Sequence, residues 1–203
     1  MYRRVTFAVA VLFLLGVCLS ASAANRLRVS GDNSWVAFVN GEQVGEGNDW
    51  QAVGDYEFDL INGAAVIAVY VHDAEPGAAG VGGALMDVVL DDGQYFGSDE
   101  TWKANAGVPI EERNDGWETM DFDDSGWEPA FLLDQFGGGV WGFGADVMRQ
   151  VLNNPDCTAF WVWAGPNDGA DEAYFRLTIG ELGTTSVEPA EKMSLTWGGI
   201  KTR

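Results

Sequence analysis

Short apolar runs separated by turns rich in glycine and aspartate dominate the pattern of hydrophobic and polar positions along this chain. The clearest example is residues 35–73, which read WVAFVNGEQVGEG, a short loop, DYEFDL and then AAVIAVYVHD. Asn40-Gly41 stands between two extended runs, and this dipeptide is a strong signal for a two-residue β-hairpin because both central residues need a positive φ. The stretch therefore predicts successive antiparallel strands.

Five further turn-bounded segments and one helical segment extend this pattern over the chain. Short strands at regular spacing with turn signals between them are typical of an all-β sandwich. One short helix is predicted over Ala145–Leu152, and Asn153-Asn154-Pro155 ends it. The predicted strands are Arg26–Ser30, Ser34–Val39, Glu42–Gly45, Tyr56–Asp59, Ala65–His72, Ala84–Leu90, Gln94–Phe96, Thr158–Ala164 and Ala173–Ile179.

The two ends of the chain differ from this pattern. Two arginines precede the apolar run Phe7–Leu19, and a small-residue cleavage site follows it, so we predict a signal peptide over residues 1–23. A lipoprotein attached at Cys18 fits less well, since Val17 stands where a small residue is expected. We expect a β-sandwich over residues 24–183 and a linker and tail over residues 184–203. The protein is then secreted, periplasmic or extracellular.

Charge and cysteine content narrow the function classes. The formal net charge is -20, with 31 acidic residues against 11 lysines and arginines. Such a charge repels nucleic acid and anionic membranes, so we expect no nucleic-acid partner and no membrane insertion after signal cleavage. Only Cys157 remains after cleavage, which excludes an intrachain disulfide.

Several segments together resemble a known family. The run GAAVIAVYVHD, the hairpin before it, and the later segments DDGQYFGSDETWKAN and DFDDSGWEPA are similar to galactose-binding-like (discoidin-type) jelly-roll domains. The resemblance covers residues 26–130 and is to the non-catalytic N-terminal β-sandwich modules of β-galactosidases, β-glucuronidases and α-L-rhamnosidases. Residues 160–179, FWVWAGPNDGADEAYFRLTI, resemble the strands that open these modules but come last here, as in a circular permutation.

This resemblance implies an antiparallel jelly-roll β-sandwich, with residues 131–156 as an insertion that holds the short helix. The family includes sugar binders, protein binders and structural spacers, so the fold alone does not choose among them. The chain is also too short for a sandwich plus a barrel-type catalytic domain, which usually needs ~250 residues. We therefore expect a protein that is not an enzyme.

The residues that could carry catalysis or bind metal are few. His72 is the only histidine, no G-x-S-x-G motif accompanies it, and a zinc site needs more nitrogen or sulfur ligands. Residues 121–126 imitate the start of a calcium loop, but Leu132 stands where the bidentate glutamate belongs. We interpret that segment as a structural turn on which Trp127 packs, and expect no cofactor, with a structural calcium elsewhere as an open alternative.

Strand direction predicts where loops gather. If successive strands run antiparallel, the turn at Asn40-Gly41 lies at one end of the sandwich. The loops Gly47–Gly54, Asp73–Gly82 and Ser98–Glu118 then meet at the other end. That end is the predicted ligand-binding end.

Four residues at this end are the predicted ligand-binding residues: Trp50, Asp73 and Trp117, with His72 at the rim. Saccharides stack their C–H faces on aromatic rings while polar side chains bond their hydroxyls, and such sites combine few polar groups with an apolar surface. The alternative is that Trp50 and Trp117 only pack over the end of the sandwich. For Trp35, Trp102, Trp161 and Trp163, packing is the favoured role.

Three functions follow from these observations. The first is a secreted non-catalytic carbohydrate-binding module, with a glycan or polysaccharide as partner, acting alone or as an accessory subunit of glycan processing. The second is a structural or adhesion protein that contacts an envelope or matrix protein. The third is a glycoside hydrolase, which the single histidine and the absence of a motif disfavour.

Overall fold

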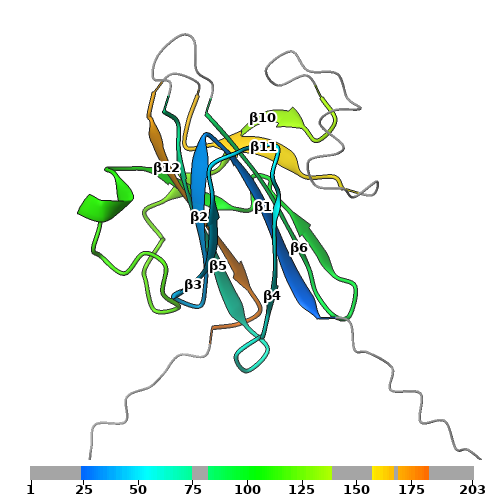
Figure 1. Ribbon diagram of the computed structural model, residues 1–203. Helices are drawn as coiled ribbons and strands as arrows, with labels where there is room; N and C mark the ends of the chain where they lie inside the picture. The colour runs from blue at the N-terminus through cyan, green and yellow to red at the C-terminus, as the bar shows by residue number, and fades with distance from the viewer. Residues whose placement is uncertain (1–23, 75–81, 139–156, 167–168, 183–203) are drawn as a thin grey trace, which may run out of the picture.

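Two antiparallel β-sheets face each other in the computed structural model, which describes residues 24–74, 82–138, 157–166 and 169–182 (Figure 1). The first sheet has the order β10-β11-β6-β1-β4, and β7 pairs with β6. Its strands are β1 (Asn25–Asp32), β4 (Gly54–Phe58), β6 (Gly83–Val89), β7 (Tyr95–Gly97), β10 (Phe131–Gln135) and β11 (Phe160–Trp163).

The second sheet has the order β3-β2-β5-β12-β8-β9. Its strands are β2 (Ser34–Val39), β3 (Glu42–Gly47), β5 (Ala65–His72), β8 (Lys103–Ala106), β9 (Glu128–Pro129) and β12 (Glu172–Ile179). The single helical turn among the described residues is the 3-10 helix η1 (Ile110–Glu112). The predicted all-β sandwich is therefore confirmed.

Alternation of side chains builds the core between the sheets. In β2, Trp35, Ala37 and Val39 are buried, while the intervening residues are partly exposed on the outer face. The central strand β5 is different, because seven consecutive residues are buried and only His72 is partly exposed. A strand buried on both faces needs a cover on its outer side, and residues 107–127 supply that cover here.

All nine predicted strands exist, with bounds within two residues of the prediction. Three strands were missed. Alanine and asparagine make β8 a weak strand former, β9 has only two residues and contains a proline, and β10 was assigned to the insertion. The predicted helix Ala145–Leu152 lies outside the described residues, as do the predicted signal peptide and the tail.

The Asn40-Gly41 hairpin is confirmed in detail. Asn40 has a φ of 54° and Gly41 a φ of 89°, as the turn requires. The Asn40 side chain also accepts a hydrogen bond from the Val66 amide at 2.8 Å. Asn40 therefore shapes the turn and also ties the hairpin to β5.

The segments that resemble the opening strands of the family lie in opposite sheets. β11 pairs with β6 and β10 in the first sheet, whereas β12 lies between β5 and β8 in the second. The four tryptophans expected to pack do so, since Trp35, Trp102, Trp161 and Trp163 are each at most 2% exposed. Among the described residues, no helix has the length and apolar character needed to cross a membrane.

Candidate functional site

Strand register brings polar side chains from distant parts of the chain onto one surface. His72, the last residue of β5, lies opposite Ser34 in β2 and opposite Glu172 in β12. Residues two apart along a strand face the same side, so the next row on this outer face contains Val36, Tyr70 and Tyr174. These two rows, apart from the covered Tyr174, form the floor of a pocket.

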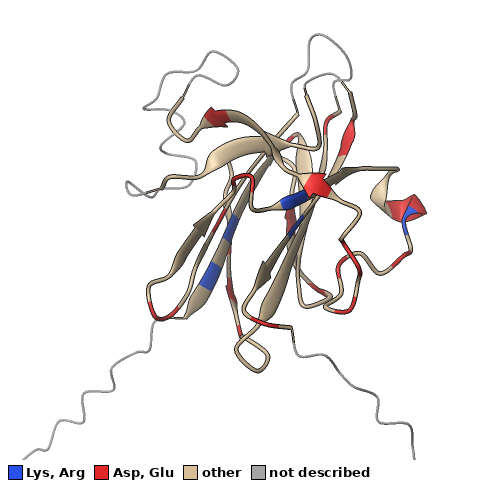
Figure 2. Cartoon of the chain, turned by 180° about the vertical axis from the view of Figure 1, so that it is seen from behind, with Lys and Arg blue, Asp and Glu red and all other residues tan. Residues whose placement is uncertain are grey.

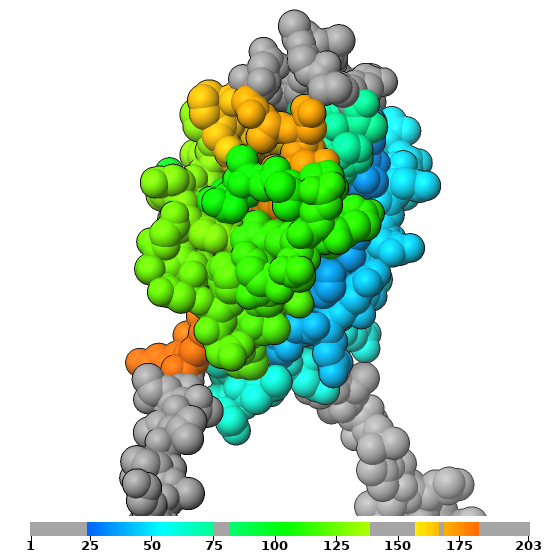
Figure 3. Space-filling model, turned by 90° about the vertical axis from the view of Figure 1, so that its left-hand side faces the viewer, coloured from blue at the N-terminus to red at the C-terminus, as the bar shows by residue number. Residues whose placement is uncertain are grey.

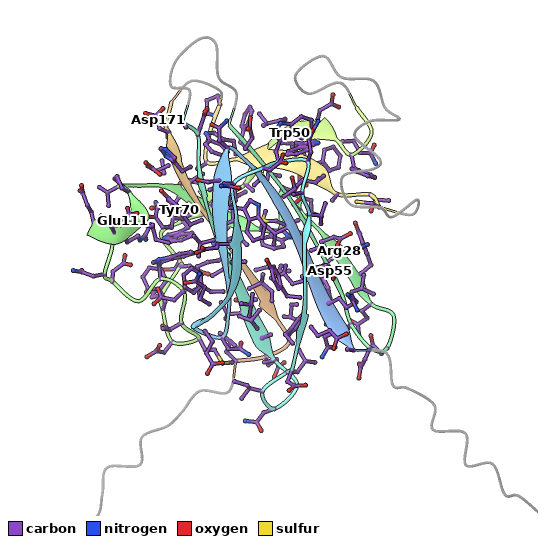
Figure 4. The ribbon with its side chains drawn as sticks, in the orientation of Figure 1. Arg28, Trp50, Asp55, Tyr70, Glu111 and Asp171 are labelled. Atoms are coloured by element: carbon purple, nitrogen blue, oxygen red, sulfur yellow. The ribbon has the colours of Figure 1, made fainter. Side chains whose placement is uncertain are left out.

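The pocket has a volume of about 550 Å³, within the ~300–1,000 Å³ typical of small-molecule sites. One wall is the end of β3, with Glu46, Gly47 and Asn48, and the other is the η1 segment, with Pro109, Ile110 and Glu111. In Figure 3 the green η1 segment covers part of this face beside the blue and cyan surface of β2 and β3. Figure 4 places Tyr70 next to the segment that carries Glu111.

A hydrogen-bonded group of three side chains lies on the pocket floor. The Tyr70 hydroxyl donates to Oε2 of Glu172, and Nδ1 of His72 lies 3.0 Å from Oε1 of the same carboxylate. Burial, reinforced by the bond to Glu172, raises the pKa of the Tyr70 phenol, so the phenol stays protonated and donates at neutral pH. The Glu172 carboxylate is therefore held in one orientation by two partners.

This group can still bind a ligand. Each carboxylate oxygen of Glu172 has a second acceptor position, and the His72 side chain is 38% exposed. With Nδ1 directed at Glu172, the other ring nitrogen of His72 faces no hydrogen-bond partner in the described part of the chain. The floor therefore suits a ligand that carries several hydroxyl or amino groups.

Trp35 contributes to the pocket only from below. Its ring is 2% exposed, and its indole Nε1 is buried without a hydrogen-bond partner among the described residues. A ligand could not reach this nitrogen without movement of the protein. Trp35 therefore supports the floor rather than recognising a ligand.

Contacts made by Tyr174 and Arg113 hold the η1 wall against the sheet. The Tyr174 hydroxyl donates to the Val108 carbonyl at 2.7 Å, and burial raises the pKa of Tyr174 to about 12 although the Arg113 charge acts in the opposite direction. The Arg113 guanidinium lies 4.2 Å from the centroid of the Tyr174 ring and 5.0 Å from that of Trp127. It also donates to Asn105 of β8 at 3.2 Å. These contacts position η1 beside the pocket.

Arg176 fixes the rest of the cover. Its side chain is 1% exposed and donates to the Asp124 carboxylate at 3.0 Å. It also donates to the backbone carbonyls of Trp117 and, at 3.1 Å, Thr119. The loop from 117 to 124 therefore covers the sheet face around Tyr174 and leaves the surface at Tyr70, His72 and Glu172 open as the pocket.

The position of Trp117 corrects its predicted role. Trp117 is 2% exposed and packs edge-on against Tyr174 at 4.8 Å and Phe38 at 5.5 Å between ring centroids. At 2% exposure, Trp117 has no free ring surface on which a saccharide could stack. Trp117 belongs to the cover of the sheet and does not line the pocket.

Trp50 and Asp73 also lie outside the pocket lining. Trp50 packs against Trp161 at 6.4 Å between ring centroids, over the outer face of the first sheet, and Figure 4 shows it at the same end of the sandwich as Asp171. Asp73 is 5% exposed, and its backbone amide donates to the Asp171 carbonyl at 2.8 Å. Of the four predicted residues, the pocket contains only His72.

The candidate pocket lies at the end of the sandwich at which sequence reasoning expected a ligand. Two of the three predicted loops do contribute, through Gly47 and Asn48 and through Pro109 to Glu111. Sequence reasoning missed Tyr70 and Glu172. Tyr70 could have been found, because it precedes His72 by two residues on the same strand face, whereas Glu172 becomes a neighbour only through the pairing of β5 with β12.

Charged groups outside the pocket also serve structural contacts. On the outer face of the first sheet, Arg28 forms a bidentate pair with the fully buried Asp87, both bonds being 2.6 Å long. Figure 2 shows the two arginines of β1 among acidic residues that are spread over strand ends and loops. In the predicted turn, Asp123 accepts from the Ser125 amide at 3.0 Å, and Trp127 is buried as expected. No cluster of three or more potential metal ligands occurs within the described ranges.

Comparison with known proteins gives one relative in sequence and a few in structure. No protein-family model matches the chain. An α-L-rhamnosidase of Streptomyces avermitilis is 34% identical over 134 residues, which is 66% of this chain and 13% of that protein. The chain thus spans a small part of the length of this relative.

The structural similarities are more distant. The crystal structure of the Streptomyces avermitilis α-L-rhamnosidase complexed with L-rhamnose has a TM-score of 0.48 and 28% identity, over 59% of this chain and 12% of that one. The Pleurotus ostreatus lectin in complex with GalNAc has a TM-score of 0.46 and 18% identity, over 59% of this chain and 35% of that one.

Proposed function

We propose that this protein is a non-catalytic carbohydrate-binding module that holds a saccharide in the pocket between β3 and η1. The observation that carries the proposal is the Tyr70–Glu172–His72 group on the floor of a pocket of about 550 Å³. Saccharides present many hydroxyl groups, and sites that bind them combine few oriented polar groups with apolar surface. Val36 and Ile110 supply apolar surface beside this group.

The sequence similarity supports the same proposal. A stretch of 134 residues is 34% identical to part of a protein named for its action on a sugar. We further propose that the sandwich is of the galactose-binding-like type and that the protein is exported, with its predicted signal peptide removed. A role beside a glycan-processing enzyme is part of this proposal.

Each residue of the group has a defined part. Glu172 accepts hydrogen bonds from ligand hydroxyls, because each of its oxygens has a second acceptor position beside the one occupied by Tyr70 or His72. His72 offers its second ring nitrogen. Tyr70 orients the carboxylate. Ser34 and Asn48 also line the pocket and add polar contacts.

A glycan array on the purified protein, followed by calorimetry on the best ligand, tests this function. Glu172→Gln keeps the size of the side chain but removes its charge, and hydrogen bonds to charged groups contribute about 1.5–3 kcal/mol. We expect affinity to fall at least about tenfold. Glu100→Gln is the matched control, since Glu100 is exposed between β7 and β8 and does not line the pocket.

Three results would contradict the proposal. The protein could bind no glycan on the array, or Glu172→Gln could bind as tightly as Glu100→Gln while melting at a similar temperature. Release of the chromophore from aryl glycosides by the pure protein would contradict the non-catalytic part.

A further inference from the structure

We infer that the pocket selects its saccharide by charge, accepting neutral and amino sugars and rejecting sugars that carry sulfate or carboxylate groups. This inference rests on the proposed function and adds the class of ligand. It starts from the distribution of charge around the pocket. The formally charged side chains that line it are three glutamates, Glu46, Glu111 and Glu172, and the lining includes neither lysine nor arginine.

The three carboxylates come from three sides of the pocket. Glu172 lies on the floor and is 9% exposed, whereas Glu46 on β3 and Glu111 on η1 are exposed on opposite walls. Glu46 lies opposite Val36 in the β2–β3 ladder, and Val36 lies opposite Tyr70. Directly opposite residues face the same side of a sheet, so Glu46 stands on the same face as Tyr70. A ligand on the floor therefore meets negative charge from below and from both sides.

The nearby cations do not offset this charge, because each already has an acidic partner. Arg113 lies behind η1, where it stacks on Tyr174 and pairs with Asp115 at 3.0 Å. Arg176 is buried under the cover and pairs with Asp124. The partner of Glu46 is neutral, since Gln43 donates to it at 3.1 Å. His72 is the one lining group that can gain a positive charge, and it faces the Glu172 carboxylate.

The expected loss of affinity for an anionic sugar can be estimated from the typical contribution of exposed charge pairs. Such pairs change an equilibrium constant by roughly 1.5- to 5-fold each. Glu46 and Glu111 together should therefore weaken the binding of an anionic sugar by about 2- to 25-fold. Screening at physiological salt acts over about 8 Å, so the distant charges of this acidic protein contribute less than the pocket wall.

The test compares two array glycans, the neutral glycan that binds best and the same glycan carrying one sulfate. We expect the sulfated glycan to bind at least about twofold more weakly. In the Glu46→Gln/Glu111→Gln variant the difference in affinity between the neutral and the sulfated glycan should shrink by about 2- to 25-fold. The control variant Glu100→Gln/Glu128→Gln removes the same number of charges from exposed positions outside the pocket and should keep the difference.

The inference is overturned if the sulfated glycan binds the native protein as tightly as the neutral one. It is equally overturned if the difference survives in the pocket variant, or shrinks to the same extent in the control, because net charge and not the pocket would then be the cause. A protein that binds no glycan at all would instead contradict the proposed function.

Discussion

Replacing Gly47 by alanine should destabilise the protein, because the new methyl group would meet the ring of Trp35. Gly47 lies directly opposite Trp35 in the β2–β3 ladder. A Cβ atom at Gly47 would lie 2.6 Å from Cε2 and Cζ2 of Trp35 and 2.7 Å from its Nε1. Ordinary carbon contacts need about 3.5–4.0 Å, so the ring or the strand has to move by more than half an ångström.

The ring has little room to move. Trp35 is 2% exposed, and on another side its Cη2 lies 2.3 Å from the Cβ position of Gly54. Inserting a methyl group into such a packed site costs about 1–3 kcal/mol. For a chain of this size each kcal/mol lowers Tm by about 2–4 °C, so we expect Gly47→Ala to melt about 2–12 °C lower.

Urea denaturation measures the loss, and Gly126→Ala is the matched control. Gly126 has no atom within 4 Å of its Cβ position and no positive φ. The same substitution there should be neutral or stabilise by about 0.4–1 kcal/mol, because it restricts only the unfolded chain. The comparison separates packing from backbone entropy.

A double-mutant cycle with Trp35→Leu tests whether the clash with the Trp35 ring causes the loss of stability. Trp35→Leu alone leaves a cavity, but it removes the ring atoms that the methyl group introduced by Gly47→Ala would meet. Gly47→Ala should therefore cost less in the Trp35→Leu background, giving a coupling energy of about 0.5–3 kcal/mol. Equal costs in the two backgrounds, or a Gly47→Ala protein as stable as Gly126→Ala, would refute the reasoning.

Two further predictions concern ion pairs and alkaline pH. Arg176→Met should lower the free energy of unfolding in urea by about 3–5 kcal/mol, because it leaves the Asp124 carboxylate and two backbone carbonyls beneath the cover without their donor. Arg26→Met should lower it by under about 1 kcal/mol, because both side chains of that ion pair are more than 40% exposed. Similar losses in the two variants would argue against the anchoring role of Arg176. Burial raises the pKa of Tyr174 from its ordinary value of 10 to about 12, so the stability that depends on its protonated form is complete below pH 10 and is lost as the pH rises through 12. Between pH 8 and pH 12 the Tm of Tyr174→Phe should fall less steeply than the Tm of the native protein. Identical slopes would contradict the assignment of this pH dependence to Tyr174.

Most of the fold could be predicted from the sequence because the signals are local. Alternating burial identifies β2, and the Asn40-Gly41 pair identifies its hairpin from two adjacent residues. The weak strands show the limit of such signals. The segment that forms β8 has little intrinsic preference for a strand and becomes one because it pairs with β12.

The candidate site was only partly predictable, since locating a site requires knowing both the end of the sandwich and the sheet face on which it lies. Strand alternation indicated the end and placed His72 there. It could not show that Trp50 faces the first sheet, that Trp117 is covered, or that the open surface lies on the outer face of the second sheet. Those facts depend on contacts between residues far apart in the chain.

The sequence by itself determined nine of the strands, the Asn40-Gly41 turn, four of the buried tryptophans and the acidic character of the protein, because periodicity and turn chemistry act over a few residues. Only the tertiary structure decided that Glu172 meets Tyr70 and His72, a hundred residues earlier in the chain, through the pairing of β12 with β5. It also decided which part of the sheet remains open, because the buried Arg176 holds the covering loop below the pocket. Long-range pairing and packing select one arrangement among many that the same local pattern allows.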